Sequence, residues 1–379
     1  MPSPTSSVHD RISGRATRQG SGRYAQRFAG RAAFGHFREV AGGLLASSIG
    51  IGTYLGEPDP ATDRAYTDSV VAAVEGGFNL VDSAINYRFQ RSERSVGAAL
   101  KQLIARGFSR EEIILCTKAG FLTPDGAMPP DANEYFAQEY VSRGLLRPEE
   151  IAQGCHSMAP AYLADQLERS SRNLGVRCVD VFYLHNPETQ LPEVPRNEFR
   201  QRIHDAFAFL ESAVSDGRIG SYGMATWNAF REDAKSPGYL SLEEIVSIAR
   251  EVAGQTHHFR FVQLPFNLAM PEALTRPNQV VGGRTLAMVQ AARPLGVTLV
   301  SSAALLQGQL TKNLPPYIGD TLGLNTNAAL ALQFARSAPG ISTVLVGMSN
   351  VEHVKTNLSL VRIEPAPREQ FLKLFGTRG

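Results

Sequence analysis

Apolar runs and helical patterns alternate along most of this chain. From residue 48 onward, eight short runs rich in apolar or β-branched residues predict strands at 48–53, 80–83, 113–118, 179–185, 219–224, 261–265, 298–302 and 343–346. Between them, apolar positions recur at helical spacing at 68–78, 160–175, 205–217, 240–254, 284–296 and 327–340, and most of these stretches end in glycine. The pattern predicts an α/β protein with a parallel sheet.

Eight β-then-α units are the number that closes a (β/α)8 TIM barrel, so we expect a single barrel domain over residues 41–379. The rival fold is a doubly wound open sheet, which usually has a GxGxxG turn leading from its first strand into a helix. The early glycines in GIGTYLG, residues 50–56, do not lead into a helix on that spacing. The pattern therefore favours the barrel.

Two segments fall outside the repeating pattern. Residues 119–158 separate the third strand from its helix and are too long for an ordinary βα loop, so we expect an insertion that covers the carboxyl face of the barrel. Residues 1–40 are rich in Arg, Ser and Gly and lack an apolar signal-peptide core. They are interpreted as a flexible extension, with an organelle transit peptide as the alternative.

Composition narrows the possible functions. The chain has 38 Lys+Arg against 36 Asp+Glu, a formal charge of +2, which disfavours a nucleic-acid or membrane partner and favours a small-molecule substrate. Its three cysteines are far apart, with no CxxC pair and no histidine at ligand spacing, so neither a metal site nor a disulfide framework is expected. No apolar run reaches the length of a membrane span. A cytoplasmic location fits, and the oligomeric state stays open.

Polar residues end three successive predicted strands. Asp82 ends the second, Lys118 the third and His185 the fourth, while Tyr87 lies in the loop after the second. In a barrel these ends meet on one face. Singly, each side chain has an ordinary alternative as a cap, a packed ring, an extended lysine or a core histidine. Together they suggest a proton-donating tyrosine, with a lysine to stabilise its phenolate and a carboxylate to keep the lysine charged.

These residues resemble an aldo-keto reductase. The likeness covers roughly residues 45–362 and depends on GIGTY at 50–54, DSAINY at 82–87, Lys118 after a strand, DVFYLHNPE at 180–188, VQLPFNL around Gln263, and VGMSNVEHVKTNL at 346–358. The resemblance implies a barrel without a Rossmann motif, binding NADP, with NAD as the alternative. It also implies that hydride passes between the nicotinamide and a carbonyl or alcohol, with Tyr87 as the general acid and base, and with Lys118, Asp82 and His185 assisting.

The same resemblance assigns residues to the cofactor and the substrate. The cofactor positions are Gly52, Thr53, Thr226, Gln263, Ser302, Leu305, Gln307, Gly347, Ser349, His353 and Asn357, and the substrate positions are Tyr54 and Trp227. Some depart from the family pattern: Ala225 and Thr226 replace Ser-Asn, Ser302 replaces a stacking tyrosine, and His353 lies where many members have a basic residue for the 2′-phosphate. Lys312 and Lys355 are candidates for the missing charge.

Three functions remain distinguishable. The first is a reductase of aldehydes, ketones or sugars, expected to lose activity when Tyr87 becomes Phe. The second is a nucleotide-binding regulatory or scaffold subunit on the same fold, suggested by Ala225 and Ser302 and expected to bind nucleotide with little turnover. The third is an unrelated barrel hydrolase that uses Asp82 and His185 and needs no nicotinamide.

Overall fold

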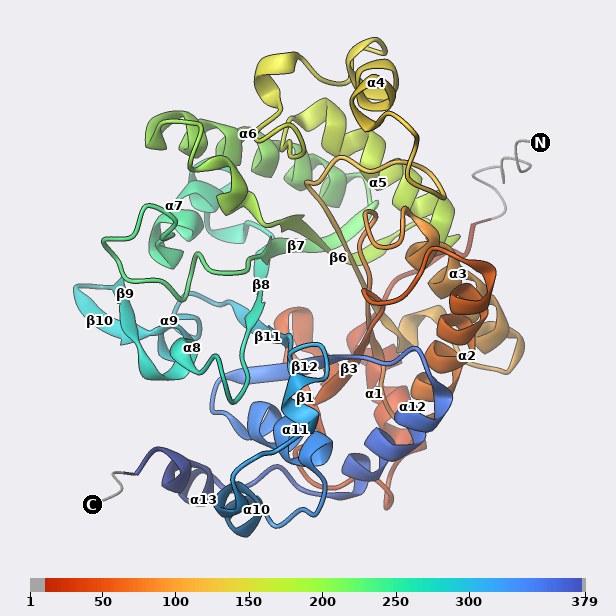
Figure 1. The fold of residues 1–379 in the computed structure, drawn as a ribbon, viewed down its shortest axis with the longest axis vertical. Helices are drawn as coiled ribbons and strands as arrows, with labels where there is room; N and C mark the ends of the chain where they lie inside the picture. Colours follow the sequence, from red (N-terminus) through yellow and green to blue (C-terminus); the bar gives the residue numbers. More distant parts are fainter. Residues whose placement is uncertain (1–10, 377–379) are drawn as a thin grey trace.

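The chain folds into a closed barrel of eight parallel strands, seen end-on in Figure 1. This computed structural model describes residues 11–376. The strands follow one another around the barrel as β11, β12, β3, β4, β5, β6, β7 and β8. Their bounds are β3 Ile49–Gly52, β4 Leu80–Asp82, β5 Ile114–Ala119, β6 Val179–His185, β7 Ile219–Ala225, β8 Phe259–Pro265, β11 Thr298–Ser302 and β12 Ile341–Gly347. Every strand predicted from the sequence is confirmed, and so is the TIM-barrel fold.

Helices surround the barrel, as Figure 1 shows. The longer ones are α2 Pro60–Gly76, α3 Arg91–Ala105, α5 Pro160–Leu174, α6 Arg196–Ser215, α7 Leu242–Ala253, α11 Asn327–Ser337 and α12 Val351–Leu358. Shorter ones are α4 Ala132–Phe136, α8 Glu272–Thr275, α9 Met288–Ala291, α10 Pro316–Leu322 and α13 Arg368–Leu372.

Local sequence sets the ends of these helices. α2 begins after Asp59, whose carboxylate accepts a hydrogen bond from the Thr62 amide at 2.7 Å, and proline occupies its first turn. α5 ends at Gly175, which adopts the left-handed conformation at φ 67° that glycine adopts without a steric penalty.

The amino-terminal segment closes one end of the barrel. Helix α1 (Arg18–Arg27) and the antiparallel pair β1 (Phe37–Val40) and β2 (Leu44–Ser47) precede the first barrel strand. Ala16, Val40 and Ala46 join the apolar cluster inside the barrel. The amide of Ala16 donates to Asp180 at 2.6 Å, and the guanidinium of Arg38 donates to the carbonyl oxygens of Ile341 at 2.8 Å and Arg336 at 2.6 Å.

The expectation of a flexible extension through residue 40 is therefore wrong for residues 11–40. Tyr24 explains why: its ring is fully buried, and its hydroxyl donates to the carbonyl of Val74 at 2.6 Å. The arginine-rich composition resembles that of a solvated tail, and composition alone cannot show which of the few apolar residues pack against the barrel domain. Residues 1–10 lie outside the described residues.

One predicted helix is partly a strand. The apolar spacing of residues 284–296 predicts a helix, but β10 (Arg284–Ala287) pairs with β9 (Pro277–Val281) in an antiparallel hairpin, and only the short α9 follows. Gly282 and Gly283 both have positive φ and form the turn, as is typical of tight hairpins. The Gly-Gly pair is the local signal for a hairpin, and the helical spacing of the apolar residues obscures it.

Residues 119–158 form the expected insertion between β5 and α5, and they contain α4 and a following π-helical turn, Ala137–Val141. Figure 1 shows α4 at the edge of the molecule. Within residues 11–376, no helix is both long and apolar enough to span a bilayer.

Candidate active site

A buried ion pair lies at the carboxyl ends of β4 and β5. The Lys118 ammonium is 2.5 Å from Oδ2 of Asp82 and donates to the carbonyl of Ser83 at 2.8 Å. The other carboxylate oxygen, Oδ1, accepts from the Gln263 amide at 2.9 Å. Lys118 is 0% exposed and Asp82 is 3% exposed. The neighbouring strands β4, β5 and β6 thus bring together residues that are far apart in the sequence.

Tyr87 lies over this pair. Its ring centroid is 4.9 Å from the Lys118 nitrogen, and its ring meets the imidazole of His185 edge-on, with centroids 5.8 Å apart. Tyr87 is half-buried, whereas Lys118 is enclosed. The four predicted side chains therefore meet at one end of the barrel, with Tyr87 the most accessible of them to a ligand.

Burial and charge set the ionisation of this group. Burial lowers the pKa of Lys118, but the charge of the Asp82 carboxylate, joined by that of Tyr87 once it is a phenolate, outweighs this effect and raises the pKa above its ordinary value, so the ammonium stays charged. Burial raises the pKa of the Tyr87 hydroxyl, while Lys118 acts in the opposite direction. Burial also lowers the pKa of His185 well below its ordinary value, and Lys118 adds to this effect. At neutral pH the cluster holds a charged lysine, a protonated tyrosine and a neutral histidine.

The two predicted substrate residues are exposed aromatics. Tyr54 is 55% exposed and packs edge-on against Tyr87, with ring centroids 4.9 Å apart. Trp227 is 43% exposed in the segment after β7. Its backbone amide donates to the Glu188 carboxylate at 2.6 Å, and the amide of Asn228 donates to the same oxygen at 3.2 Å. Glu188 therefore anchors the segment that presents Trp227, a role the sequence did not suggest.

Five of the eleven predicted cofactor residues lie at the carboxyl end of a barrel strand or directly after it. Gly52 ends β3, Ser302 ends β11 and Gly347 ends β12, while Thr53 and Thr226 each follow a strand directly. Leu305 and Gln307 are in the loop after β11, where Gln307 has a positive φ of 53°. The Thr226 hydroxyl and Nδ1 of His185 are buried and have no hydrogen-bond partner among the described residues. These two groups fit a polar ligand bound across this face.

Asn350 caps the helix after β12, α12: its side chain accepts a hydrogen bond from the Glu352 amide at 2.8 Å. Ser349, one of the predicted cofactor residues, immediately precedes this cap. His353 is exposed, whereas Asn357 is 6% exposed and donates to the Met348 sulfur at 3.2 Å.

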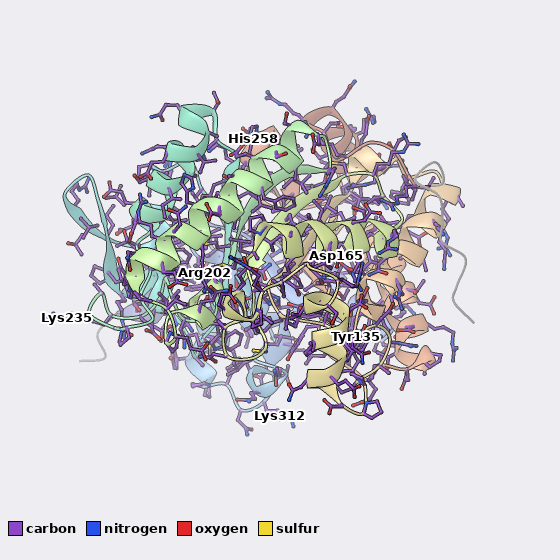
Figure 2. All side chains as sticks on the ribbon, turned by 90° about the horizontal axis from the view of Figure 1, so that it is seen from above. Tyr135, Asp165, Arg202, Lys235, His258 and Lys312 are labelled. Atoms are coloured by element: carbon purple, nitrogen blue, oxygen red, sulfur yellow. The ribbon has the colours of Figure 1, made fainter. Side chains whose placement is uncertain are left out.

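The two lysines considered for a phosphate differ in their surroundings. Lys355 pairs with Glu352 at 2.7 Å, while Lys312 is exposed after β11. Figure 2, a side view, shows Lys312 with Lys235 and Tyr135 toward one end of the molecule and His258, just before β8, toward the other. All three residues at the first end belong to segments that follow barrel strands, so this end carries the candidate site.

Sequence reasoning missed part of the site's support. Gln263 was assigned to the cofactor alone, but its amide also holds Asp82. Phe121, in the insertion, meets His185 edge-on at 5.3 Å. Hydrophobic periodicity could not predict either contact, because each joins two segments that are distant in sequence and meet only in the closed barrel.

Comparisons with known proteins agree with this geometry. The model of the aldo/keto reductase family matches residues 48–316. A putative voltage-gated potassium channel subunit beta from Schizosaccharomyces pombe is 24% identical over 345 residues, covering 87% of this chain and 89% of that protein. The holo form of an aldo-keto reductase from Bacillus halodurans superposes with a TM-score of 0.60 at 20% identity, covering 89% of this chain and 95% of the other.

A second solved structure, an aldo/keto reductase from Klebsiella pneumoniae in complex with NADP and acetate, gives a TM-score of 0.60 at 17% identity, covering 90% and 95% of the two chains. At these identities the superpositions show a shared fold. The family model covers more than half of the chain, and it includes the strands that carry Asp82, Lys118 and His185. The chain therefore belongs to the aldo/keto reductase family.

Proposed function

We propose that this protein is an NADP-dependent oxidoreductase that interconverts a carbonyl and an alcohol, with Tyr87 as the general acid and base. The observation that carries the proposal is the buried Asp82–Lys118 pair beneath the half-buried Tyr87 ring, beside the neutral His185. Family membership supports the reaction class.

Each of the four residues has a defined task in this proposal. In the reductive direction Tyr87 gives its proton to the carbonyl oxygen, and the Lys118 charge stabilises the phenolate that remains. Asp82 keeps Lys118 charged inside the protein, where an isolated ammonium would lose its proton. The neutral His185 orients the carbonyl oxygen toward the Tyr87 hydroxyl.

The bound nicotinamide supplies or accepts the hydride that none of these side chains can provide. The residues proposed to hold it are Thr226, with its unpartnered hydroxyl, and the segment from Gly347 to the start of α12. A helix amino terminus suits a phosphate group, and Gly347 leaves open space, since a Cβ atom at this position would have no heavy atom within 4 Å. NADP is proposed over NAD because solved relatives hold NADP or NADPH.

The decisive experiment compares Tyr87→Phe with Tyr183→Phe. Carbonyl reduction is followed by the loss of NADPH absorbance with a panel of aldehydes, ketones and sugars. Tyr87→Phe should lower kcat by about 10² to 10⁴, the usual contribution of a general acid, while NADPH binding stays within about twofold. Tyr183, a buried tyrosine of β6 inside the barrel, is the matched control and should keep its activity. Full activity in Tyr87→Phe would reject the assignment.

A regulatory role is the second candidate. Two observations favour it: the likeness to a putative channel subunit, and Ser302 at the end of β11, where its small side chain offers no aromatic surface for stacking. Such a protein would bind NADPH by fluorescence titration but show negligible turnover with every substrate in the panel. The hydrolase alternative is less compatible with the site, because both oxygens of Asp82 already accept hydrogen bonds from Lys118 and Gln263.

A further inference from the structure

The long insertion after β5 returns to the active site before α5 begins. Its two ends run antiparallel: the amide of Leu122 donates to the carbonyl of Cys155 at 2.7 Å, and the amide of Ser157 donates to the carbonyl of Gly120 at 2.8 Å. Between these bonds, Phe121 and His156 are paired. The pairing places the fully buried His156 beside the end of β6.

His156 contacts the backbone of His185. Its Nε2 is 2.7 Å from the His185 carbonyl oxygen. The other ring nitrogen, Nδ1, is 3.1 Å from the amide nitrogen of Gln190, whose amide oxygen accepts from the Arg202 guanidinium at 2.9 Å. The chain of contacts thus runs from Arg202 on α6, through Gln190 and His156, to His185.

The direction of this chain follows from Arg202. A guanidinium only donates, so it must face the oxygen of the Gln190 amide, and the Gln190 nitrogen must face His156. Nδ1 of His156 is then an acceptor, and the ring proton is on Nε2, where it donates to the His185 carbonyl. Burial lowers the pKa of His156 to about 4, which keeps this neutral form at physiological pH.

Gly120 leaves the space that this contact requires. A Cβ atom at position 120 would lie 2.6 Å from Nε2 of His156 and 2.6 Å from the carbonyl oxygen of His185. Both distances are far below van der Waals contact, so a side chain at this position would disrupt the hydrogen bond. Phe121 supports the same arrangement, since its ring meets the rings of His156 and His185 edge-on at 5.2 Å and 5.3 Å.

The orientation of the His185 ring depends on such support. Within residues 11–376 its Nδ1 has no hydrogen-bond partner, so no side chain holds the imidazole directly through that nitrogen. Its position follows from its backbone, from Phe121 and from Tyr87. Asn186, the next residue, has left-handed backbone geometry with φ 47°, so the chain turns sharply at this point.

We propose that His156 is a positioning residue for the active site: by donating to the His185 carbonyl, it fixes the end of β6 and thereby the orientation of the His185 imidazole toward Tyr87. Gln190 and Arg202 set the tautomer that makes this possible. The insertion at 119–158 is then a structural part of the active site. This inference rests on the proposed oxidoreductase function.

The main test uses three histidine variants. His156→Phe keeps an aromatic ring against Phe121 but cannot donate. His156→Gln keeps one donor and one acceptor in a planar group. His36→Phe is the matched control, because His36 is also fully buried with Nε2 3.0 Å from a backbone carbonyl, that of Gly77, but belongs to the amino-terminal segment. Unfolding temperature and NADPH affinity are measured for each variant beside kcat and KM.

We expect His156→Phe to lower kcat by about 10- to 100-fold, because a small displacement of a catalytic group costs up to about 10²-fold. NADPH affinity should stay within about twofold, and His156→Gln should recover kcat to within about threefold of the wild type. A kcat within about threefold of the wild type for His156→Phe, or an equal loss in His36→Phe, would overturn the proposal. If His156→Phe does not fold, Gln190→Met removes the hydrogen bond that sets the His156 tautomer, together with the contact to Arg202, and should lower kcat at least about threefold. An unchanged kcat in this variant would also overturn the proposal.

A spectroscopic readout separates this proposal from the proposed function. In ¹⁵N-histidine-labelled protein, His156 should show the Nε2–H tautomer, and the His185 ring signals should shift in His156→Phe but not in His36→Phe. This holds even if no carbonyl substrate turns over, a result that would reject the oxidoreductase assignment alone. An Nδ1–H tautomer for His156, or unmoved His185 signals in His156→Phe, would reject the positioning role whatever the activity.

Discussion

The substitution Asp82→Asn tests the ion pair on which the proposed chemistry depends. In the native protein the two carboxylate oxygens accept separately, Oδ2 from Lys118 at 2.5 Å and Oδ1 from Gln263 at 2.9 Å. Asparagine has one acceptor oxygen and an NH2 group that only donates. Either Lys118 or Gln263 must therefore face this NH2 group, donor against donor. The fully buried Lys118 ammonium would keep the Ser83 carbonyl but lose its counter-charge.

The magnitude follows from burial. Removing one partner of a buried ion pair costs about 3–5 kcal/mol. For 379 residues, an unfolding entropy of about 2.1 cal/mol/K per residue gives about 0.8 kcal/mol/K, so the unfolding temperature should fall by about 4–6 °C. Because burial then lowers the pKa of Lys118 without the opposing carboxylate, the Tyr87 phenolate loses its support and kcat should fall by about 10² or more.

Asp180→Asn is the matched control for this experiment. Asp180 is 3% exposed and forms a buried pair with Arg110 at 2.7 Å, but it also binds the amide of Ala16, in the segment that closes the opposite end of the barrel. Calorimetry and steady-state kinetics on both variants should show a similar loss of stability, with loss of kcat confined to Asp82→Asn. Wild-type kcat in Asp82→Asn, or an equal loss in Asp180→Asn, would refute the reasoning.

Two further predictions concern the cofactor and pH. His353→Arg adds a guanidinium in the first turn of α12 and should tighten NADPH binding by about tenfold, the gain expected from one charge-assisted hydrogen bond. NADH binding, measured in the same fluorescence titration, should be unchanged. An equal gain for both cofactors would show that residue 353 does not contact the 2′-phosphate. Burial lowers the pKa of His36 and His156 from 6.5 to about 4, so the unfolded chain binds more protons between these values and stability falls as pH drops through this window. Urea unfolding should show a loss of about 2 kcal/mol per histidine at about pH 5, and His36→Phe should remove its share of that slope; a slope equal to the wild type would contradict the assignment.

The repeating β-then-α pattern was sufficient to predict the barrel. Most barrel strands are rich in apolar or β-branched residues, because both of their faces are largely buried, and the polar residues at the ends of β4, β5 and β6 stand out against those runs. Asp82, Lys118 and His185 could be identified for this reason. Their convergence with Tyr87 follows from the strand order β4, β5, β6, in which neighbours in sequence are neighbours in the barrel.

Hydrophobic periodicity did not predict the structure where a residue packs against a segment distant in sequence, or where two local patterns indicate different structures. Tyr24 lies in a stretch whose arginines resemble a solvated tail, yet its burial depends on β2 and on the chain around Val74. The hairpin of β9 and β10 was obscured by apolar residues at helical spacing. The role of His156 could not be predicted for a third reason. It lies in an irregular segment of about forty residues, and no local pattern in such a segment shows that His156 is buried against His185.

The closure of the barrel by the amino-terminal segment has a consequence for how the chain reaches this structure. Arg38 is synthesised 298 residues before Arg336 and 303 residues before Ile341, whose carbonyl groups it binds. A growing chain therefore carries an unsatisfied arginine and an uncovered Tyr24 while most of the barrel is still being made. Contacts between residues this distant in sequence form slowly. We therefore expect the amino-terminal segment to close its end of the barrel late in folding, after the last strand and the helix before it have been synthesised.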